Sequence, residues 1–538
     1  LMLFSVLAFG QNRTISGTVT DEKGDAVPGA SVRIKGVRTG VAADNSGKFS
    51  ILANTGDVLV VSGTNIETIE VTVGAGNSVA IQAKSKATTG TEVIVTSAYG
   101  MKKSLRNVST NTQVVTGEQL NTIRQTNLNN ALAGKVSGLQ VRSQSSAKLG
   151  NAGTGSLRLR GETGFGGGGE PIYVVDGTIL PNINDVNMDD VEDLTVLQGP
   201  AAAAIFGPQG ARGAIVITLK KAKKGAKGVG IEVNLGAQLD KVYILPNYQN
   251  SYAGGNTQDL IKYNYKAGDP ELWKQLDGKY YHDYSDDASW GPRMVGQEYI
   301  PWYSWYDGHR YAGTTTSLVP QPNNARDYYD NGVVLNNSVS FSKATENVSL
   351  RLGFNNVDAK GLVPTTRLKK NVFNLSGSIE LTKKLTAAIN FNYATQILNG
   401  EFDDQYSNQT TGSFNQWFHR NLDMNIIKEL KDLRTPSGIW SSWNHNNPTT
   451  YDPGNEKSFY AGNYWYNFYK WFDLVKPLTQ TDRYFGDISL SYQFSKALRV
   501  KGTYRKSSNM VWSETKYSSD LLESGTQTTG NCGECRGY

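Results

Sequence analysis

The second half of the chain contains seven short stretches in which apolar and polar residues alternate with period two. At 348–355, valine, leucine and phenylalanine occupy one phase, while serine, arginine, glycine and asparagine occupy the other. A strand with one face in lipid and the other in a wet lumen shows this pattern. Unpaired backbone groups are costly in hydrocarbon, so such strands must belong to a closed barrel. The alternation therefore predicts an antiparallel transmembrane β-barrel, and it recurs before the turn near 344 and at 231–238, 373–381, 385–393, 488–495 and 498–504.

The connections between these stretches alternate between very short and very long. Tight turns are predicted near 344–345, 382–384 and 495–497, and the remaining links run over 240–333, 357–370 and 395–483. In outer-membrane barrels the short turns face the periplasm and the long loops face the outside. A soluble β-sandwich is the alternative interpretation, but connections far beyond ~12–15 residues do not suit a compact soluble domain.

Length and composition further limit the class of protein that this chain can be. A chain of 538 residues is long enough for several domains. Its hydrophobic fraction of 38% and its lack of a long apolar stretch exclude a helical membrane protein. Residues 1–10 are interpreted as the remnant of a signal peptide, with a buried first strand as the alternative, so the mature chain is expected to start at Gln11. The net charge of +6 is small for this length, and no nucleic-acid partner is expected.

The sequence contains no recognisable catalytic or metal-binding motif. The basic run 220–227 is interpreted as a solvated linker between domains. Cys532 and Cys535 form a C-x-x-C pair, for which a local disulfide is the better prediction, because two thiolates alone do not complete a zinc site. The four histidines lie in predicted loops without metal-ligand spacing. We therefore expect no catalytic residues, no metal site and no cofactor, and the chain is not expected to be an enzyme.

Residues 11–84 are predicted to form a small β-sandwich. From residue 13 onward, short β-prone runs are separated by turns rich in glycine, asparagine and aspartate. The text at 17–32 and 43–49 resembles the carboxypeptidase-regulatory-like domain, a non-catalytic appendage. This copy has no histidine and glutamate ligand set that would make it a peptidase.

A β-prone segment at 91–100 stands between flexible linkers, with no partner strand expected nearby. Such a segment can add a strand to another protein, although an ordinary strand of the next domain is the alternative. Its sequence, acidic-Val-Ile-Val-Thr followed by Tyr-Gly, resembles the TonB box of SusC/RagA-type TonB-dependent outer-membrane transporters of Bacteroidetes. The resemblance implies that TonB is bound from the periplasmic side by Glu92, Val93, Ile94, Val95, Thr96, Ser97, Ala98 and Tyr99.

Five further stretches follow in the order that this family's plug domain shows: 128–141, 156–161, 171–177, 191–200 and 213–219. The resemblance implies a mostly β protein with an α/β plug inside a 22-stranded barrel that this chain covers only in part. Seven strands are evident and an eighth is expected near 511–519, so we interpret the chain as the amino-terminal part of a longer protein. The expected divisions are a signal-peptide remnant at 1–10, the sandwich at 11–84, a linker with the TonB box at 85–104, the plug at 105–224 and the first barrel strands and loops at 225–538.

By this resemblance the protein lies in the cell outer membrane, in contact with its lipid, and imports oligosaccharides or peptides with energy from TonB. A SusD-like lipoprotein is expected as an extracellular lid, with a dimer of SusC–SusD pairs as one assembly to consider. A signal-transducing receptor and a passive porin or adhesin are the alternatives. The sequence itself does not distinguish a glycan from a peptide substrate.

Two regions are candidates for contact with substrate or partner. The glycine-rich stretch 164–170 leads into a strand and not into a helix, so it is a plug loop and not a phosphate cradle. The long loops are crowded with aromatic residues, which could stack on sugars or pack on peptides, or could instead form loop cores, a membrane-interface belt or a docking face. The candidate contacts are Gly164, Phe165, Gly166, Glu170, Trp290, Trp302 and Trp305.

Overall fold

The computed structural model describes residues 13–22, 24–37, 39–63, 66–84, 94–96, 102–104, 112–122, 128–141, 149, 157–161, 169–183, 186–222, 228–400, 414 and 417–521. The predicted signal-peptide remnant, Cys532 and Cys535, and much of the basic linker 220–227 lie outside the described residues. The chain divides into two compact units, Leu1–Ile94 and Val95–Tyr538. Among the described residues, no helix is long and apolar enough to cross a bilayer.

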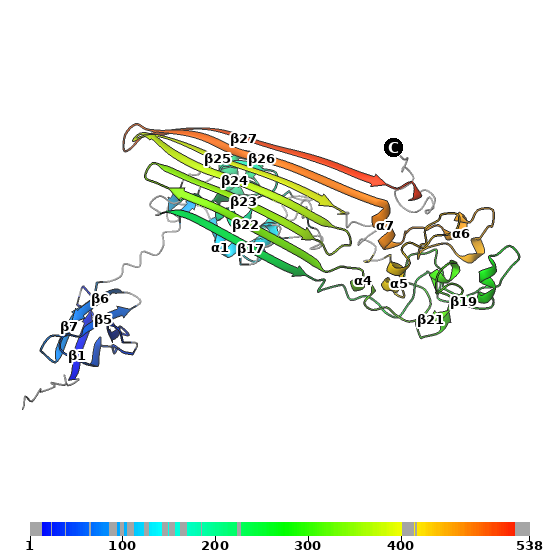
Figure 1. Cartoon of the computed structure of the whole chain (residues 1–538), viewed down its shortest axis with the longest axis horizontal. Helices are drawn as coiled ribbons and strands as arrows, with labels where there is room; N and C mark the ends of the chain where they lie inside the picture. The colour runs from blue at the N-terminus through cyan, green and yellow to red at the C-terminus, as the bar shows by residue number, and fades with distance from the viewer. Residues whose placement is uncertain are drawn as a thin grey trace, which may run out of the picture. The chain divides into compact units, whose positions relative to one another are not determined.

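The first unit is a small β-sandwich, drawn in blue in Figure 1. Its two sheets share one apolar core, to which β1 contributes Ile15 and Val19 and β5 contributes Leu59 and Val61. Alternate residues of β4 are buried, as expected for a strand with one face on a core. One sheet contains β4 (Lys48–Ala53), β1 (Arg13–Thr20) and β7 (Ser78–Gln82), and the other contains β3 (Gly40–Ala42), β2 (Ser31–Ile34), β5 (Val58–Gly63) and β6 (Ile66–Thr72).

Two short strands, β8 (Ile94–Thr96) and β9 (Lys102–Ser104), pair in a two-stranded sheet. The expectation that the segment at 91–100 has no neighbouring strand is therefore wrong. The partner follows only a few residues later in the chain, where the sequence Lys-Lys-Ser shows no apolar alternation.

The plug contains a five-stranded mixed sheet in the order β10–β15–β16–β13–β14. Strand β16 is buried along almost its whole length and pairs in parallel with β13, which explains its continuous apolar sequence Ala-Ile-Val-Ile-Thr-Leu. Helix α3 has a proline in its first turn and ends at Gly207, whose φ is 69°. The elements are β10 (Thr112–Thr116), α1 (Gly117–Leu120), α2 (Leu128–Ala131), β11 (Leu139–Val141), β12 (Leu157–Leu159), β13 (Ile172–Val175), β14 (Thr178–Leu180), η2 (Met188–Asp190), β15 (Val191–Leu197), α3 (Gly199–Phe206), η3 (Gly207–Gly210) and β16 (Ala214–Leu219).

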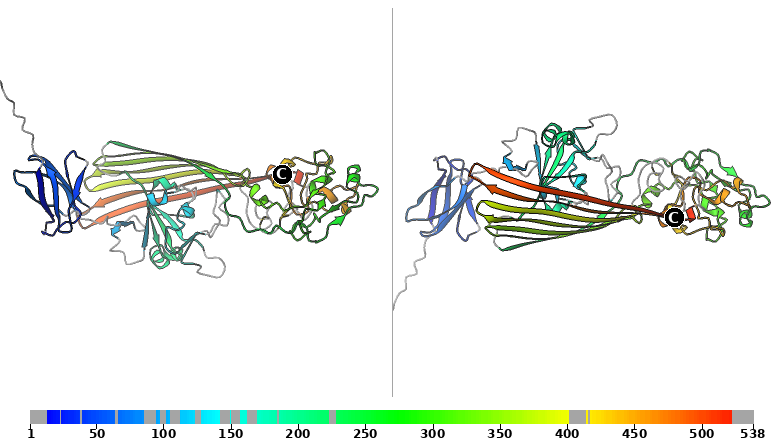
Figure 2. Two further views of the ribbon diagram at one scale, coloured as in Figure 1. Left: turned by 90° about the horizontal axis from the view of Figure 1, so that it is seen from below. Right: turned by 90° about the horizontal axis from the view of Figure 1, so that it is seen from above.

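The remaining strands form one antiparallel sheet of seven strands in sequence order, as the alternation predicts. Figure 2 shows the plug against one face of this sheet. The large apolar residues of the predicted phase are exposed on the other face, for example Leu350 and Phe354, whereas Arg351 and Asn355 of the opposite phase are buried. The strands are β17 (Val229–Asp240), β22 (Gly332–Ala344), β23 (Val348–Lys360), β24 (Arg367–Thr382), β25 (Leu385–Asn399), β26 (Val475–Gln493) and β27 (Arg499–Tyr517).

Two predictions about this sheet are wrong for one reason. The expected eighth strand near 511–519 is the second half of β27, and the expected long link 357–370 is short because β23 reaches Lys360 and β24 begins at Arg367. The alternation typical of a strand in lipid ends before the strands do, although the backbone pairing continues. In β23 and β24 the apolar residues change to the inward phase, as at the buried Val357, Ala359 and Leu368, and in β27 the consecutive apolar residues 510–512 break the alternation. Arg367 and Asp358 form a cross-strand ion pair of 2.7 Å.

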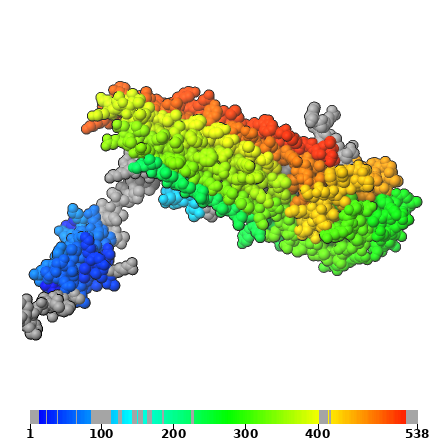
Figure 3. All heavy atoms as spheres, viewed as in Figure 1, coloured from blue at the N-terminus to red at the C-terminus, as the bar shows by residue number. Residues whose placement is uncertain are grey.

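The two long connections, which follow β17 and β25, are confirmed, and they fold together into one body beyond the sheet. We call the described residues of 241–331 and 400–474 the loop body. In Figure 3 its green and yellow-to-orange parts form one continuous mass. Its short elements are β18 (Ile261–Lys262), η4 (Glu271–Leu276), β19 (Tyr280–Tyr281), β20 (Glu298–Tyr299), η5 (Trp302–Trp305), β21 (Thr316–Ser317), α4 (Asn324–Asp327), α5 (Met424–Glu429), η7 (Pro448–Thr450), α6 (Lys457–Tyr460) and α7 (Phe468–Leu474).

Candidate functional site

The plug is held on the polar face of the sheet by a buried ion pair. The Arg351 guanidinium on β23 donates to Asp190 Oδ1 of the plug over 2.6 Å, and both side chains are almost fully buried, at 5% and 6% exposure. Ser338 Oγ on β22 donates to Asp189 Oδ2 over 2.7 Å. We call these four residues the plug seat. A pair removed from water in this way is costly to break from one side, because the remaining charge is left without compensation.

The local sequence explains how the plug seat forms. Asn187 begins η2 by accepting a hydrogen bond from the Asp189 backbone N–H, and its amide donates to Asp190 Oδ2 over 3.1 Å. Gly353 follows Arg351 in the same phase of β23 and leaves room for the incoming carboxylate, since a Cβ there would lie 3.1 Å from Asp190 Oδ1. The glycine in this strand therefore marks a close approach of the plug.

A second set of contacts lies between β26, β27 and the β13–β14 hairpin of the plug. Arg483 on β26 is buried, and it donates to Asn182 Oδ1 over 2.9 Å and to Asn509 Oδ1 of β27. Phe485, on the same face of β26, belongs to the apolar core of the plug. Arg505 of β27 lies against Gly177, where a Cβ would be 2.9 Å from its Nη2. Two separate parts of the plug, η2 and the β13–β14 hairpin, are thus joined to the large sheet.

The exit from the plug toward β17 is tied back to the plug sheet. Asp176 has φ 45° and accepts a hydrogen bond from the Leu219 backbone N–H over 3.3 Å. Burial raises the pKa of Asp176, although Lys221 Nζ lies 3.9 Å from its carboxylate. Lys220 approaches Glu232 of β17 to 3.6 Å. These contacts hold the last plug strand next to the first strand of the large sheet.

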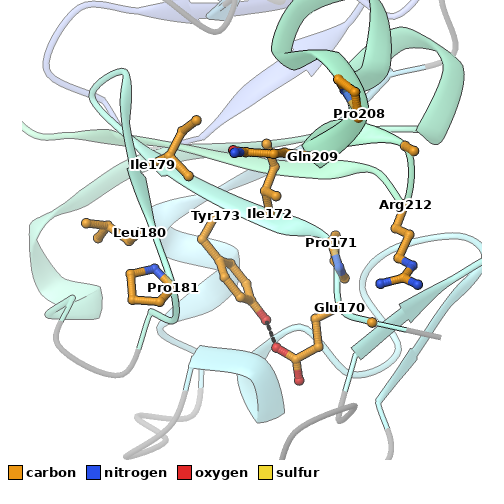
Figure 4. Close-up of a pocket in the computed structure, with 12 residues that line it drawn as sticks. Glu170, Pro171, Ile172, Tyr173, Ile179, Leu180, Pro181, Pro208, Gln209 and Arg212 are labelled. Atoms are coloured by element: carbon orange, nitrogen blue, oxygen red, sulfur yellow. Dashed lines mark hydrogen bonds between the residues drawn. The ribbon is translucent and has the colours of Figure 1, made fainter. Parts of the chain in front are cut away.

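The plug also carries an open hollow of about 890 Å³. Figure 4 shows Glu170 and Arg212 toward one end of it and Ile179, Leu180 and Pro181 toward the other. The Tyr173 hydroxyl donates to Glu170 Oε2 over 3.1 Å, and burial together with this carboxylate raises the pKa of Tyr173, which keeps the phenol protonated. A hollow with a largely apolar lining and polar groups at one end can hold a peptide side chain or one face of a sugar.

The structure separates the predicted contact residues. Of the glycine-rich stretch, Gly164, Phe165 and Gly166 lie outside the described residues, whereas Glu170 lines the hollow. Trp302 and Trp305 are buried in the loop body, at 4% and 0% exposure, whereas Trp290 is 73% exposed. The Trp305 ring packs edge-on against Trp273, which donates its indole N–H to Trp305 O. This burial favours the packing role for Trp302 and Trp305, and a direct contact with substrate or partner stays a prediction.

The coupling segment is described only at its centre. The backbone of Ile94, Val95 and Thr96 forms β8. Glu92, Val93, Ser97, Ala98 and Tyr99 lie outside the described residues, so the binding of TonB by this segment stays a prediction.

Sequence reasoning did not identify the plug seat or Arg483. Asp190 and Arg351 are far apart in the sequence, and the separation hides their pairing. One signal was available, because Arg351 falls in the inward phase of the predicted strand 348–355, where a charged side chain needs a partner when it is buried. No such signal existed for Arg483, because the alternation predicts a strand only from 488 onward and places 483 in the preceding connection.

Comparison with known proteins gives the family. Residues 15–95 match the CarboxypepD_reg-like domain and residues 104–214 match the TonB-dependent Receptor Plug Domain. A TonB-dependent receptor of Formosa agariphila is 27% identical over 392 residues, which cover 71% of this chain and 34% of the relative. The TonB-dependent receptor SusC of Bacteroides thetaiotaomicron is 31% identical over 233 residues, which cover 42% of this chain and 22% of that protein.

Among solved structures, the RagAB peptide importer in its "open-open" state has a TM-score of 0.52 at 16% identity, and the match covers 79% of this chain and 43% of the other. This likeness shows the fold, in which the long antiparallel sheet corresponds to part of a TonB-dependent barrel. The chain spans about a third or less of the length of the curated relatives reported above. With its CarboxypepD_reg-like domain, its plug and its long sheet, the chain belongs to the SusC/RagA-type TonB-dependent receptors of the outer membrane.

Proposed function

We propose that the protein imports oligosaccharides or peptides across the outer membrane with energy supplied through TonB. The observation that carries this proposal is the plug seat, because it holds a folded domain on the inward face of a sheet whose other face is apolar. A wide barrel without such a domain would be an open pore. If polar contacts hold the domain that closes the pore, energy is needed to break them before the pore can open. This requirement favours an active transporter over a passive porin.

The segment Glu92–Tyr99 is proposed to receive the pull of TonB. It precedes the plug directly in the chain, so force applied there reaches the plug before the sheet. The strand tendency of the segment, of which Ile94–Thr96 is described, suits main-chain pairing with a partner sheet.

The extracellular side is proposed to bind substrate together with a SusD-like lipoprotein lid. The hollow near Glu170 and Arg212 offers apolar contact and hydrogen-bonding groups, which a peptide or an oligosaccharide could use. The solved neighbour is described as a peptide importer, and the lining of the hollow suits either class, so both substrate classes are retained. Trp290, exposed on the loop body, is the proposed aromatic contact.

Deletion of Glu92–Tyr99 from the full-length receptor tests the proposal. Energy-dependent uptake should be lost, while substrate binding at the cell surface should remain, since coupling and binding lie on opposite sides of the membrane. A deletion of nearly the same length in the adjacent linker, Ser85–Thr91, is the matched control and should retain uptake. Unchanged uptake without Glu92–Tyr99 would contradict the TonB assignment and favour a passive pore. A transcriptional response without uptake would favour a signalling receptor.

A further inference from the structure

The two connections of the loop body are interlocked by a short strip of the first connection. Residues His282–Asp287 lie between asparagine and aromatic side chains of the second connection. Asn444 Nδ2 donates to Tyr284 O and Asn463 Nδ2 donates to Ser285 O, each over 2.7 Å. Asn447 Nδ2 donates to Asp283 Oδ1 and Trp465 Nε1 donates to Asp287 Oδ2, again over 2.7 Å. The two connections cannot separate without exposing this strip.

Two buried histidines face each other within this interlock. His282 belongs to the first connection and His419 to the second, and their ring centroids are 5.3 Å apart. His282 is 2% exposed and His419 is 0% exposed. His419 also packs on the first connection at Gly254, where a Cβ would lie 2.1 Å from the imidazole ring. The pair therefore lies at the contact between the connections, and each ring touches both.

The hydrogen bonds of His282 require its neutral form, and the single hydrogen bond of His419 is compatible with the neutral form. Asn421 Nδ2 lies 3.1 Å from His282 Nε2, which accepts from it, so the ring proton is on Nδ1 and is donated to Asp283 O over 3.0 Å. His419 Nε2 donates to Asp286 O over 2.6 Å, and no residue that the structure describes is a hydrogen-bond partner of its Nδ1. A second proton on either ring would add a buried charge, and on His282 it would also oppose the amide of Asn421.

The surrounding groups give the direction of the pH effect. Burial and, to a lesser extent, the neighbouring His419 lower the pKa of His282 to about 3, and burial lowers the pKa of His419 to about 4. The other titratable groups facing the pair are Asp283, Asp286 and His445, with Tyr284 and Tyr299 beside His282. Burial raises the pKa of the nearby Asp287, whereas for Asp283 burial is outweighed by hydrogen bonds from Ser285 and Asn447, which lower its pKa.

We propose that the His282–His419 pair makes the interlock an acid-sensitive clasp, so that the two connections separate more readily as the medium becomes more acidic. When the connections separate, both rings meet water and regain a pKa near ~6.5. The separated form then binds more protons, so the equilibrium constant for opening rises as the pH falls through that value. The rise is up to about tenfold per pH unit for each histidine, hence about a hundredfold for the pair, until the pH approaches the pKa of the closed form. The clasp's role in admitting or releasing substrate rests on the proposed function.

Hydrogen–deuterium exchange of the full-length receptor tests the clasp. Peptides spanning 282–287 and 419–424 are followed from pH 7.5 to 4.5, with exchange corrected for its intrinsic pH dependence. Between pH 6 and 4.5, the logarithm of the opening constant should rise by close to two per pH unit. In the variant His419→Gln, whose amide can still donate to Asp286 O, the slope should fall toward one. In the double variant His282→Asn with His419→Gln it should be close to zero.

His309→Gln is the matched control, because His309 lies in the same loop body but contacts Tyr303 and Tyr311 of its own connection. Its slope should equal that of the wild type. A wild-type slope near zero, or an unchanged slope in His419→Gln, overturns the proposal. The slopes of the wild type and of His419→Gln decide the question even if the double variant fails to fold. The measurement needs no uptake, so a failed clasp and a failed transport assignment are distinguishable.

Discussion

Replacing Asp190 by asparagine should loosen the plug without removing any atom of the packing. The amide has nearly the shape of the carboxylate but no charge, so the Arg351 guanidinium stays buried without its counter-charge. Removing one partner of a buried ion pair costs about 3–5 kcal/mol. Arg351 keeps its hydrogen bond to Asn374 Oδ1 at 3.3 Å, so we expect about 3 kcal/mol, the lower end of that range. Local opening of the plug seat should become roughly a hundredfold more frequent.

Hydrogen exchange of η2 and β15 in the purified full-length receptor measures this opening, because protection factors give the free energy of local opening. The matched control is Asp358→Asn, which breaks the Arg367–Asp358 pair of the same sheet. That pair has a similar distance of 2.7 Å but is 54% and 33% exposed. An exposed pair contributes at most about 1 kcal/mol, so exchange in η2 and β15 should not change.

A double replacement separates charge from packing. Arg351→Met together with Asp190→Asn removes both charges, so the pair of substitutions should cost less than the sum of the single ones. Equal protection of η2 and β15 in the wild type and in Asp190→Asn would refute the view that the ion pair holds the plug. Strictly additive single effects would refute the pairing itself.

Two further outcomes are expected. Trp305→Ala should destabilise the loop body by about 3–5 kcal/mol because the indole is fully buried. Trp290→Ala should change the stability of the loop body by no more than about 0.5 kcal/mol and should weaken substrate or lid binding instead. Protease resistance of the loop body and binding to the purified receptor distinguish the two variants, and similar losses of resistance would contradict the assignment. Phe373→Lys on the outward face of β24 should cost up to about 2–4 kcal/mol when the receptor folds into lipid vesicles and much less in a soluble sheet, so an unchanged folding free energy would speak against lipid contact at this position.

Period-two alternation located the strands because lipid and plug select opposite residue types on the two faces. Leu350 and Phe354 face outward and Arg351 faces the plug, and this contrast is visible without any structure. The alternation fails as a guide in the second half of β27, where the consecutive apolar residues 510–512 break the period of two, and the pattern therefore predicts a separate strand there. Near Glu170 the sequence predicts only a plug loop and not the hollow, because the hollow is lined by segments that come together when the plug folds.

The partners across the plug–sheet boundary could not be predicted for a different reason. Ser338, Arg351 and Arg483 contact the plug through single polar groups, and no local pattern specifies which plug residue each one meets. The exposure of the aromatic residues in the long loops could not be predicted from the sequence either. Trp290 and Trp305 look equivalent in the sequence, yet one is exposed and the other is buried, because burial depends on how two distant connections fold together.

The length of the last two strands bears on where substrate first meets the protein. Strands β26 and β27 each have 19 residues, whereas a tilted strand needs only about 9–11 to cross a bilayer. With the tight turn between β26 and β27 placed at the edge of the hydrocarbon, the surplus of ~9 residues, at ~3.3 Å each and a tilt of about 40°, would carry the loop-body ends of these two strands to roughly 20 Å above the hydrocarbon. Substrate would therefore be captured at a height where the membrane surface no longer blocks a bulky chain. A lipid-anchored lid would need a tether of at least about six extended residues to reach the same level.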